Sequence, residues 1–498
     1  MKKLVLAISL MLAVSTLFAA GSKESTPVAG GLTEQKAKPE LRFLINSAFA
    51  DLEHDAAWKA AEDGAEYEIK YEQITGNEQL MLLIASGEPV DFVSLTPDQY
   101  QLMMNEGGLM DITDLLDQYG SEIKASITTL WPASTKGDRI YAIPSTVAQP
   151  NSLRHSVVYR KDLLDKAGIK MASTPDEFHT MLKAIKSAYP DMIPLTISNK
   201  YGKANPGAYF VQPIASAFDL MGEWQDIDGI CVPIVKNPGL KPYIEYMRGL
   251  YGEGLIDAEA PALEEKNEIA KFTSSTAVMM KASWNGSDLY TGTLSKLVPD
   301  SYVAVMPLLT DANGNATVET WSGVGAFGGI PATSKHPADA IKAINNQMRI
   351  EPFTRIALGD EGVDYTKDAD GTYHLIQPAF NQHRKNANVF ISSFYREDVY
   401  PKMWEARLEK NANLQRIFRE MKASTKSFGH PSPISLAPNV VGVDNKSALE
   451  DYVRNELVSI VAGTKPISAL DDLIKYWNAN GGQKLEDFYN GWYRMVNK

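Results

Sequence analysis

Cysteine is nearly absent from this chain. Cys231 is the single cysteine among 498 residues, so a disulfide within the chain is impossible and a disulfide-bonded scaffold is excluded. A lone cysteine usually acts as a small buried hydrophobic residue, and we expect that role for Cys231. The hydrophobic core must then stabilise the fold.

Motifs of common catalytic chemistry are also missing. None of the seven histidines has another histidine four residues away, as a helical zinc site requires. There is no Gly-x-Ser-x-Gly turn and no glycine-rich phosphate-binding loop. We therefore expect no catalytic residue, metal or cofactor. The chain has 61 acidic residues, and counting them does not exclude a pair of catalytic carboxylates of the glycosidase type. A secreted polysaccharide-active enzyme is therefore the alternative to a binding function.

Basic residues are fewer than acidic residues in this chain. The chain has 49 lysines and arginines against 61 aspartates and glutamates, a formal net charge of -12, which argues against nucleic acid as a partner. Hydrophobic residues make up 44% of the chain. That composition and length are sufficient for two domains of about 200 residues each.

Long apolar runs are confined to the N-terminus. Two lysines precede an apolar run at 4–17, and the small residues Ala19 and Ala20 follow it. This pattern predicts a signal peptide over 1–20, because the run is too short for a membrane span. No cysteine stands at the junction, so we expect a soluble periplasmic protein without a lipid anchor.

The folded part is predicted to begin near Leu41, after a disordered tether at 21–40 that is rich in Ser, Gly, Pro, Lys and Glu. Strand patterns at 41–46 and 67–74 flank a helical pattern at 56–65, which predicts a β-α-β unit and a parallel sheet. Ligands bind at the carboxyl ends of such strands. Asn46 follows the first strand, and the loop with Thr96 and Asp98 follows the next strand after a helix at 78–86.

A long polar connection separates two strands near the middle of the first half. Residues 139–143 alternate like a strand that Pro144 ends, and a polar run containing Gln149 leads to a second strand at 156–159. A short helix then ends at Gly168, a typical C-cap. We interpret this segment as a crossover from one lobe to another.

Three further local patterns predict structure. Thr174 and Glu177 form a capping box, with Pro175 at the first helical position, and predict a helix over 174–188. Asn313-Gly314 between apolar runs at 302–309 and 316–321 predicts a hairpin. This turn begins like a calcium loop, but Ala316 and Ser322 occupy the required Gly and Glu positions. The chain is then expected to cross back at 322–325, to form a strand at 328–332, and to enter a helix capped by His336-Pro337.

Several motifs resemble the extracellular solute-binding proteins of ABC transporters, of the family 1, maltose-binding-like type. They are YAIP followed by VVYRKDLLDKAGI and STPDEF, the lead-in GGLMDITDLL, AYFVQPIA, FTSSTAVMMKASW, and GDEGVDYT. The last of these, with the C-terminal segment, resembles the lipoprotein subfamily of large oligosaccharide binders. The resemblance covers about 41–493. Ser275 stands where the family has glycine, so the geometry of that turn is not fixed by the motif.

The resemblance implies an α/β, two-lobed periplasmic-binding-protein fold of type II, with a mixed sheet in each lobe and a hinge between them. It places 41–147 and 326–385 in the N-lobe, and 148–325 and 386–498 in the C-lobe. It implies a monomer that captures an oligosaccharide by hinge closure and delivers it to the membrane permease. A sensor partner of a membrane receptor would have the same fold.

Carbohydrate sites combine flat aromatic rings with polar groups for hydroxyls. Candidate ligand-binding residues are those that occupy family motif positions or lie next to the predicted strand ends and crossovers. They are Trp284, Tyr209, Trp321, Asn46, Thr96, Asp98 and Gln149. For each aromatic residue the alternative is core packing, and for each polar residue it is a cap or turn.

Overall fold

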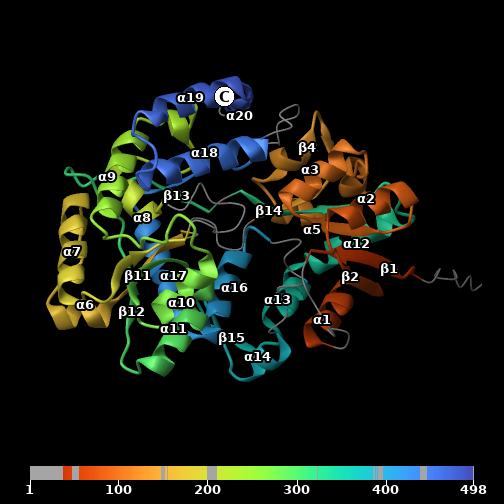
Figure 1. Cartoon of the computed structure of the whole chain (residues 1–498). Coiled ribbons are helices and arrows are strands. Elements are labelled where there is room, and N and C mark those ends of the chain that lie inside the picture. Colours follow the sequence, from red (N-terminus) through yellow and green to blue (C-terminus); the bar gives the residue numbers. More distant parts are fainter. Residues whose placement is uncertain are drawn as a thin grey trace, which may run out of the picture. The chain divides into compact units, whose positions relative to one another are not determined.

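The computed structural model describes residues 38–46, 55–146, 152–153, 155–198, 210–321, 323–384, 387, 390, 396–437 and 446–496 (Figure 1). The predicted signal peptide, the tether up to residue 37, Gln149 and Tyr209 lie outside these residues.

The first large sheet has the strand order β2-β1-β3-β14-β6. Its strands are β1 (Leu41–Ile45), β2 (Ile69–Gln73), β3 (Phe92–Leu95), β6 (Ile143–Thr146) and β14 (Val324–Gly329). β1 is parallel to β2 and β3, whereas β14 is antiparallel to β3 and β6. The predicted opening β-α-β unit is therefore confirmed, and β14 joins this sheet from a distant part of the chain.

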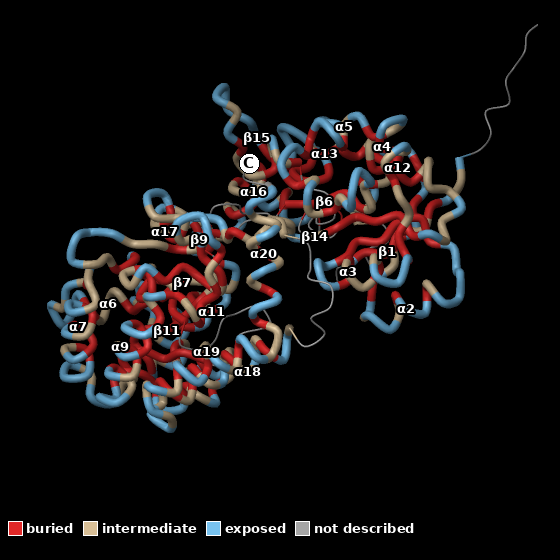
Figure 2. Tube along the Cα trace, turned by 90° about the horizontal axis from the view of Figure 1, so that it is seen from above, coloured by how far each residue is buried: buried red, intermediate tan, exposed pale blue. Residues whose placement is uncertain are grey.

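Helices cover both faces of the first sheet because its strands alternate between two hydrophobic clusters. Leu41, Phe43 and Ile45 share one cluster with α1 (Ala56–Ala65), α12 (Pro337–Gln347) and α13 (Ile350–Leu358). Leu44 faces the other cluster, with α2 (Asn77–Ser86) and α3 (Pro97–Asn105). β1, labelled in Figure 2, is buried at four of its five residues, and only Arg42 is intermediate.

The second large sheet has the order β12-β7-β11-β8. Its strands are β7 (His155–Arg160), β8 (Ile193–Thr196), β11 (Ala277–Ser283) and β12 (Val303–Val305). β7 is antiparallel to β11 and β12, and β11 is parallel to β8. α7 (Pro175–Ala188), α9 (Leu240–Gly252), α18 (Lys446–Val461), α19 (Ala469–Ala479) and α20 (Gly482–Val496) share its larger cluster, and Cys231 lies there with 1% exposure, as predicted.

On the other face of the second sheet, α10 (Glu265–Thr273), α11 (Ser287–Leu297) and α17 (Ala412–Thr425) enclose a third cluster. Helix α16 (Tyr400–Arg407) contributes Tyr400, Met403 and Ala406 to the cluster that contains β1. The remaining helices and strands are α4 (Thr113–Tyr119), α5 (Ser121–Ser126), α6 (Lys161–Ala167), α8 (Gln212–Ala215), α14 (Ala379–His383), β4 (Thr135–Lys136), β5 (Arg139–Ile140), β9 (Trp224–Ile227), β10 (Ile230–Pro233), β13 (Val318–Thr320), β15 (Tyr365–Lys367), β16 (Tyr373–Leu375) and β17 (Gly429–Pro431). The lobe limits inferred from the resemblance stay a prediction.

Three strand predictions were wrong. The return strand β14 covers 324–329 and not 328–332, so 324–325 belong to a strand and not to the predicted crossover at 322–325. Pro144 does not end a strand but lies inside β6, which is tolerated because β6 is at the edge of its sheet. The hairpin around Asn313-Gly314 does not form. Asp311 organises a tight turn by accepting the N–H groups of Asn313 and Asn315, both at 2.8 Å, but β12 pairs with β7 and β13 pairs with β17.

Helix ends were predicted more accurately. α7 begins at Pro175, and Thr174 Oγ1 accepts the Glu177 N–H at 3.4 Å. The reciprocal half of the box is different, because the Glu177 carboxylate accepts from Ser173 N at 2.9 Å. His336 precedes α12 as expected but makes no side-chain cap. Ser275, in the glycine position of the motif, adopts a positive φ of 60° and accepts a hydrogen bond from Arg160.

Candidate functional site

The carboxyl ends of four strands of the first sheet, β1, β2, β3 and β6, lie along one edge of it, because these strands run in the same direction. Asn46 follows β1 and Thr96 follows β3, and both side chains are exposed. This is the edge at which ligands bind in open α/β sheets.

Gln99 brings two of the predicted residues together at this edge. Its Oε1 accepts hydrogen bonds from Asn46 Nδ2 at 2.9 Å and from Thr96 N at 3.0 Å. Thr96 Oγ1 accepts the Gln99 N–H at 3.2 Å, which completes a capping box at the start of α3. Our sequence reasoning missed Gln99, although the Thr-x-x-Gln spacing before an apolar helix is a recognisable signal. The Thr96 hydroxyl thus serves as a helix cap, which was the alternative to a ligand contact.

Asp98 lies in the first turn of α3 and is exposed. A carboxylate in this position is favoured by the helix dipole. The Asp98 carboxylate has no hydrogen bond or ion pair with any other described residue. The Asp98 carboxylate is therefore available to a ligand beside the end of β3, whereas the Asn46 amide group already donates to Gln99.

The corresponding edge of the second sheet contains the ends of β8 and β11 and the start of β7. Trp284 follows β11 directly and is only 6% exposed. Its ring meets Phe418 at 5.2 Å between centroids and Trp404 at 5.9 Å, both edge to face. Aromatic packing therefore accounts for the position of Trp284, and its role in binding stays a prediction.

Two buried opposite charges lie next to this edge. Glu268 of α10 is fully buried and accepts the backbone N–H groups of Ser198 at 3.0 Å and Lys281 at 2.9 Å. Burial raises the pKa of the Glu268 carboxyl and lowers the pKa of the Lys281 amine, and each charge partly offsets the effect on the other. The Glu268 side chain thus joins the segment after β8 to the middle of β11.

Two connections between the large sheets meet at one described pair of residues, Ser152 and Trp321. We call 147–154 the first crossover and 321–323 the second. Ser152 and Trp321 form an antiparallel bridge between them, in which Trp321 N donates to Ser152 O at 2.8 Å. The half-buried Trp321 therefore lies on the second of two paired connections. Of the other predicted residues, Gln149 lies in the undescribed part of the first crossover, and Tyr209 lies in another undescribed segment.

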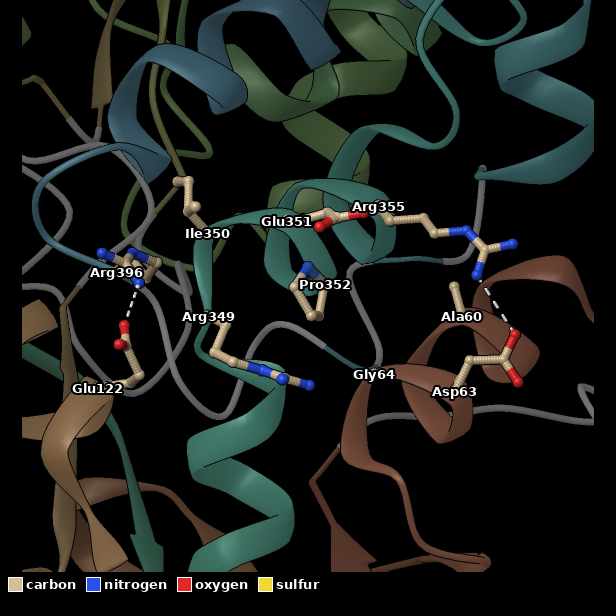
Figure 3. A pocket seen from close by; sticks show the side chains of 10 residues that line it. All are labelled: Ala60, Asp63, Gly64, Glu122, Arg349, Ile350, Glu351, Pro352, Arg355 and Arg396. Atoms are coloured by element: carbon tan, nitrogen blue, oxygen red, sulfur yellow. Dashed lines mark hydrogen bonds and ion pairs between the residues drawn. The ribbon is translucent and has the colours of Figure 1, made fainter.

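A pocket of about 590 Å³ lies among α1, α5 and α13 (Figure 3). Arg355 faces Asp63 at 3.3 Å and Arg396 faces Glu122 at 3.5 Å, while Arg349 pairs with Glu66 at 2.6 Å. The lining contains three arginines and three carboxylates, those of Asp63, Glu122 and Glu351, so their charges balance. None of the predicted ligand-binding residues lines it.

A second pocket, of about 580 Å³, differs in charge. We call it the α17 pocket, and it is lined by Thr320, Glu405, Arg419, Lys422, Ala423, Thr425, Lys426 and Gly429. Three cations face a single carboxylate, Glu405, which pairs with Lys422. Thr320 directly precedes Trp321 of the second crossover. Sequence reasoning missed this pocket because its lining comes from segments about 100 residues apart.

Two negative findings concern the described residues only. No helix in the described part of the chain is long and apolar enough to cross a membrane. Within the same residues, no group of three or more His, Cys, Asp or Glu side chains is placed to hold a metal ion.

Solved structures with the same arrangement define the fold class. A solute-binding protein of Bifidobacterium longum infantis, described as HMO-binding and ABC-transporter-associated, matches with a TM-score of 0.70 and 17% identity, over 93% of this chain and 99% of its own. The substrate-binding protein FusA of Streptococcus pneumoniae, in complex with kestose, matches with a TM-score of 0.68 and 19% identity, over 92% of this chain and all of its own. The fold is thus the two-lobed α/β solute-binding-protein fold of type II, as predicted.

The family follows from the sequence comparison. The model of the bacterial extracellular solute-binding proteins matches residues 50–347, and the chain belongs to this family. An uncharacterized protein in the butB 5' region of Niallia circulans is 30% identical over 258 residues, which are 51% of this chain and all of that protein. Lipoprotein LipO of Bacillus subtilis is 20% identical over 452 residues, 84% of each chain. The family consists of exported binding proteins, in agreement with the resemblance found in the motifs.

Proposed function

We propose that this protein is the substrate-binding component of an ABC importer and that its substrate is an oligosaccharide. The observation that carries the proposal is the match over more than 90% of the chain to solute-binding proteins described with sugars. Because identity to these proteins is below 20%, they support the class of ligand and not a particular sugar.

The proposed mechanism is closure of two lobes about a hinge. The lobes comprise 41–147 with 326–385, and 148–325 with 386–498. The paired crossovers support this mechanism, because two adjacent connections between sheets form a hinge with few residues to rearrange. A sugar that contacts both lobes favours the closed form, which the permease then recognises.

The proposed ligand-binding residues lie at the two sheet edges and the crossovers. They are Asn46, Thr96, Asp98, Gln149, Tyr209, Trp284 and Trp321. Asn46 and Asp98 are the polar candidates with exposed groups, and Trp321 is the half-buried aromatic candidate on the hinge. Sugars present apolar faces to aromatic rings and hydroxyls to amides and carboxylates.

We further propose a monomeric, periplasmic protein without catalytic activity or nucleic-acid binding. The predicted signal peptide and the absence of cysteine at its end support export without lipid attachment. Labelling cells with a radioactive fatty acid tests this point. Incorporation into the protein would contradict the proposal.

The binding proposal is tested by thermal denaturation of the purified mature protein with a panel of oligosaccharides. A ligand at 100 times its Kd stabilises the folded state by about 2.7 kcal/mol, which raises the melting temperature by several degrees. Mass spectrometry of the sugar afterwards is expected to show unchanged length. A shortened sugar would instead establish the polysaccharide-active enzyme, and no shift with any sugar would contradict the proposal.

Asp98 offers a matched pair of variants for the same assay. Asp98→Asn is expected to weaken sugar binding about tenfold, in the range of a charge-assisted hydrogen bond. Asp471→Asn removes another exposed carboxylate, from the first turn of α19, and is expected to bind normally. Equal affinity of both variants would remove Asp98 from the site.

A further inference from the structure

The α17 pocket concentrates positive charge in an acidic protein. Arg419, Lys422 and Lys426 line it at helical spacings of three and four residues, against one carboxylate. The chain as a whole has a formal net charge of -12. Such local accumulation of cations against the net charge attracts an anionic group.

Two of these cations are available for a ligand. Lys422 already pairs with Glu405 of α16. Arg419 and Lys426 are exposed, and neither side chain has a hydrogen bond or ion pair with any other described residue. The dipole at the C-terminal end of α17 favours cations there, but it supplies no acceptor for the guanidinium group of Arg419.

A buried hydroxyl is a second, independent feature of the pocket. Thr320 lines it and is 3% exposed, yet its Oγ1 has no hydrogen-bond partner within the described structure. Leaving such a group unpaired is costly, and a bound acceptor would remove that cost. Gly429 lies close to Thr320 in the lining, because a Cβ at Gly429 would come within 2.5 Å of the Thr320 methyl group.

We propose that the α17 pocket binds an oxyanion, the carboxylate or sulfate ester of an acidic oligosaccharide. The inference rests on the proposed sugar-binding function and specifies its substrate class. Thr320 directly precedes Trp321 in the chain, so this wall of the pocket lies one residue from the second crossover. Arg419 and Lys426 hold the anionic group, and Thr320 donates a hydrogen bond to one of its oxygens.

The test measures affinity for uronic-acid oligosaccharides and sulfated oligosaccharides, each beside its carboxyl-reduced or desulfated neutral counterpart. The double variant Arg419→Gln/Lys426→Gln removes the two available cations. Lys296→Gln/Lys484→Gln is its control, because it removes two exposed lysines, one from α11 and one from α20, and changes the net charge equally. The uronic-acid and sulfated arms distinguish the source of the anionic group.

We expect at least one acidic oligosaccharide to bind the wild-type protein more tightly than its neutral counterpart does. The Arg419→Gln/Lys426→Gln variant should lose at least about tenfold in affinity for it, and added salt should weaken wild-type binding more than variant binding. Thr320→Val keeps the side-chain shape and should lose several-fold in affinity without a lower melting temperature, since the hydroxyl has no partner to lose.

Other outcomes overturn the proposal in separable ways. If neutral oligosaccharides bind and acidic ones bind no better, or if the double variant binds like its control, the α17 pocket is not the anion site and the general sugar-binding function stands. If neither acidic nor neutral oligosaccharides bind, both proposals fail.

Discussion

The two sheet edges are stabilised in different ways. At the first edge, Asn46 and Thr96 are exposed and are joined by hydrogen bonds through Gln99. At the second edge, Trp284 lies in an aromatic cluster, and the buried Glu268 joins β11 to the segment after β8. Hydrogen bonds near the surface contribute about 1 kcal/mol each, whereas removing one partner of a buried charge pair, or a buried aromatic ring, costs about 3–5 kcal/mol. The first edge should therefore tolerate substitution better than the second.

Removing the Glu268 charge should have the largest effect on stability. Glu268→Gln leaves the buried Lys281 without its opposite charge and lets only one carbonyl oxygen accept the two N–H groups. We expect a loss of about 3–5 kcal/mol in the free energy of unfolding, measured in urea.

The double variant Glu268→Gln/Lys281→Met is the control for this prediction. Because it also removes the buried Lys281 amine, it should recover a substantial part of the lost stability. Equal stability of wild type and Glu268→Gln would contradict the contrast between the two edges.

Trp284→Ala should have the next largest effect on the free energy of unfolding. The ring is 6% exposed and contacts two other aromatic residues, so we expect a loss of about 3–5 kcal/mol in the free energy of unfolding. Such a loss would lower apparent affinity in any assay near the melting temperature, and a milder variant is needed to test binding.

Trp284→Phe keeps an aromatic ring in the cluster and should remain folded at assay temperature. If Trp284 contacts the sugar, this variant should bind at least about fivefold more weakly, because the larger indole surface is lost. A Phe variant with wild-type affinity would remove Trp284 from the proposed site and leave it a core residue.

The smallest effect on the free energy of unfolding is expected from substitution of Gln99. Gln99→Leu removes the acceptor shared by Asn46 and Thr96 and half of the capping box, which should cost about 1 kcal/mol. Gln99→Glu keeps the acceptor and should be near wild type in a urea titration. A loss above about 3 kcal/mol for Gln99→Leu would show that the first edge is as sensitive as the second.

Local features were predictable from sequence, and long-range pairing was not. The starts of α1 and α7 depend on caps within a few residues, and both were predicted to within one residue. The error at Pro144 arose because the sequence does not show that β6 is an edge strand. The false hairpin arose because β12 and β13 have distant partners, β7 and β17.

For the candidate site, too, local features were predictable from the sequence and long-range contacts were not. Strand ends and family motifs indicated Asn46, Thr96 and Trp284, but burial of Trp284 depends on Trp404 and Phe418, more than 100 residues away. The α17 pocket likewise depends on the approach of Thr320 to α17. Neither contact leaves a local pattern in the sequence.

The most direct test of the account is small-angle X-ray scattering of the purified protein with and without a saturating oligosaccharide found in the thermal screen. Closure about the paired crossovers predicts a smaller radius of gyration in the presence of the sugar. An unchanged radius at saturation, with tight binding established by titration, would contradict capture by hinge closure.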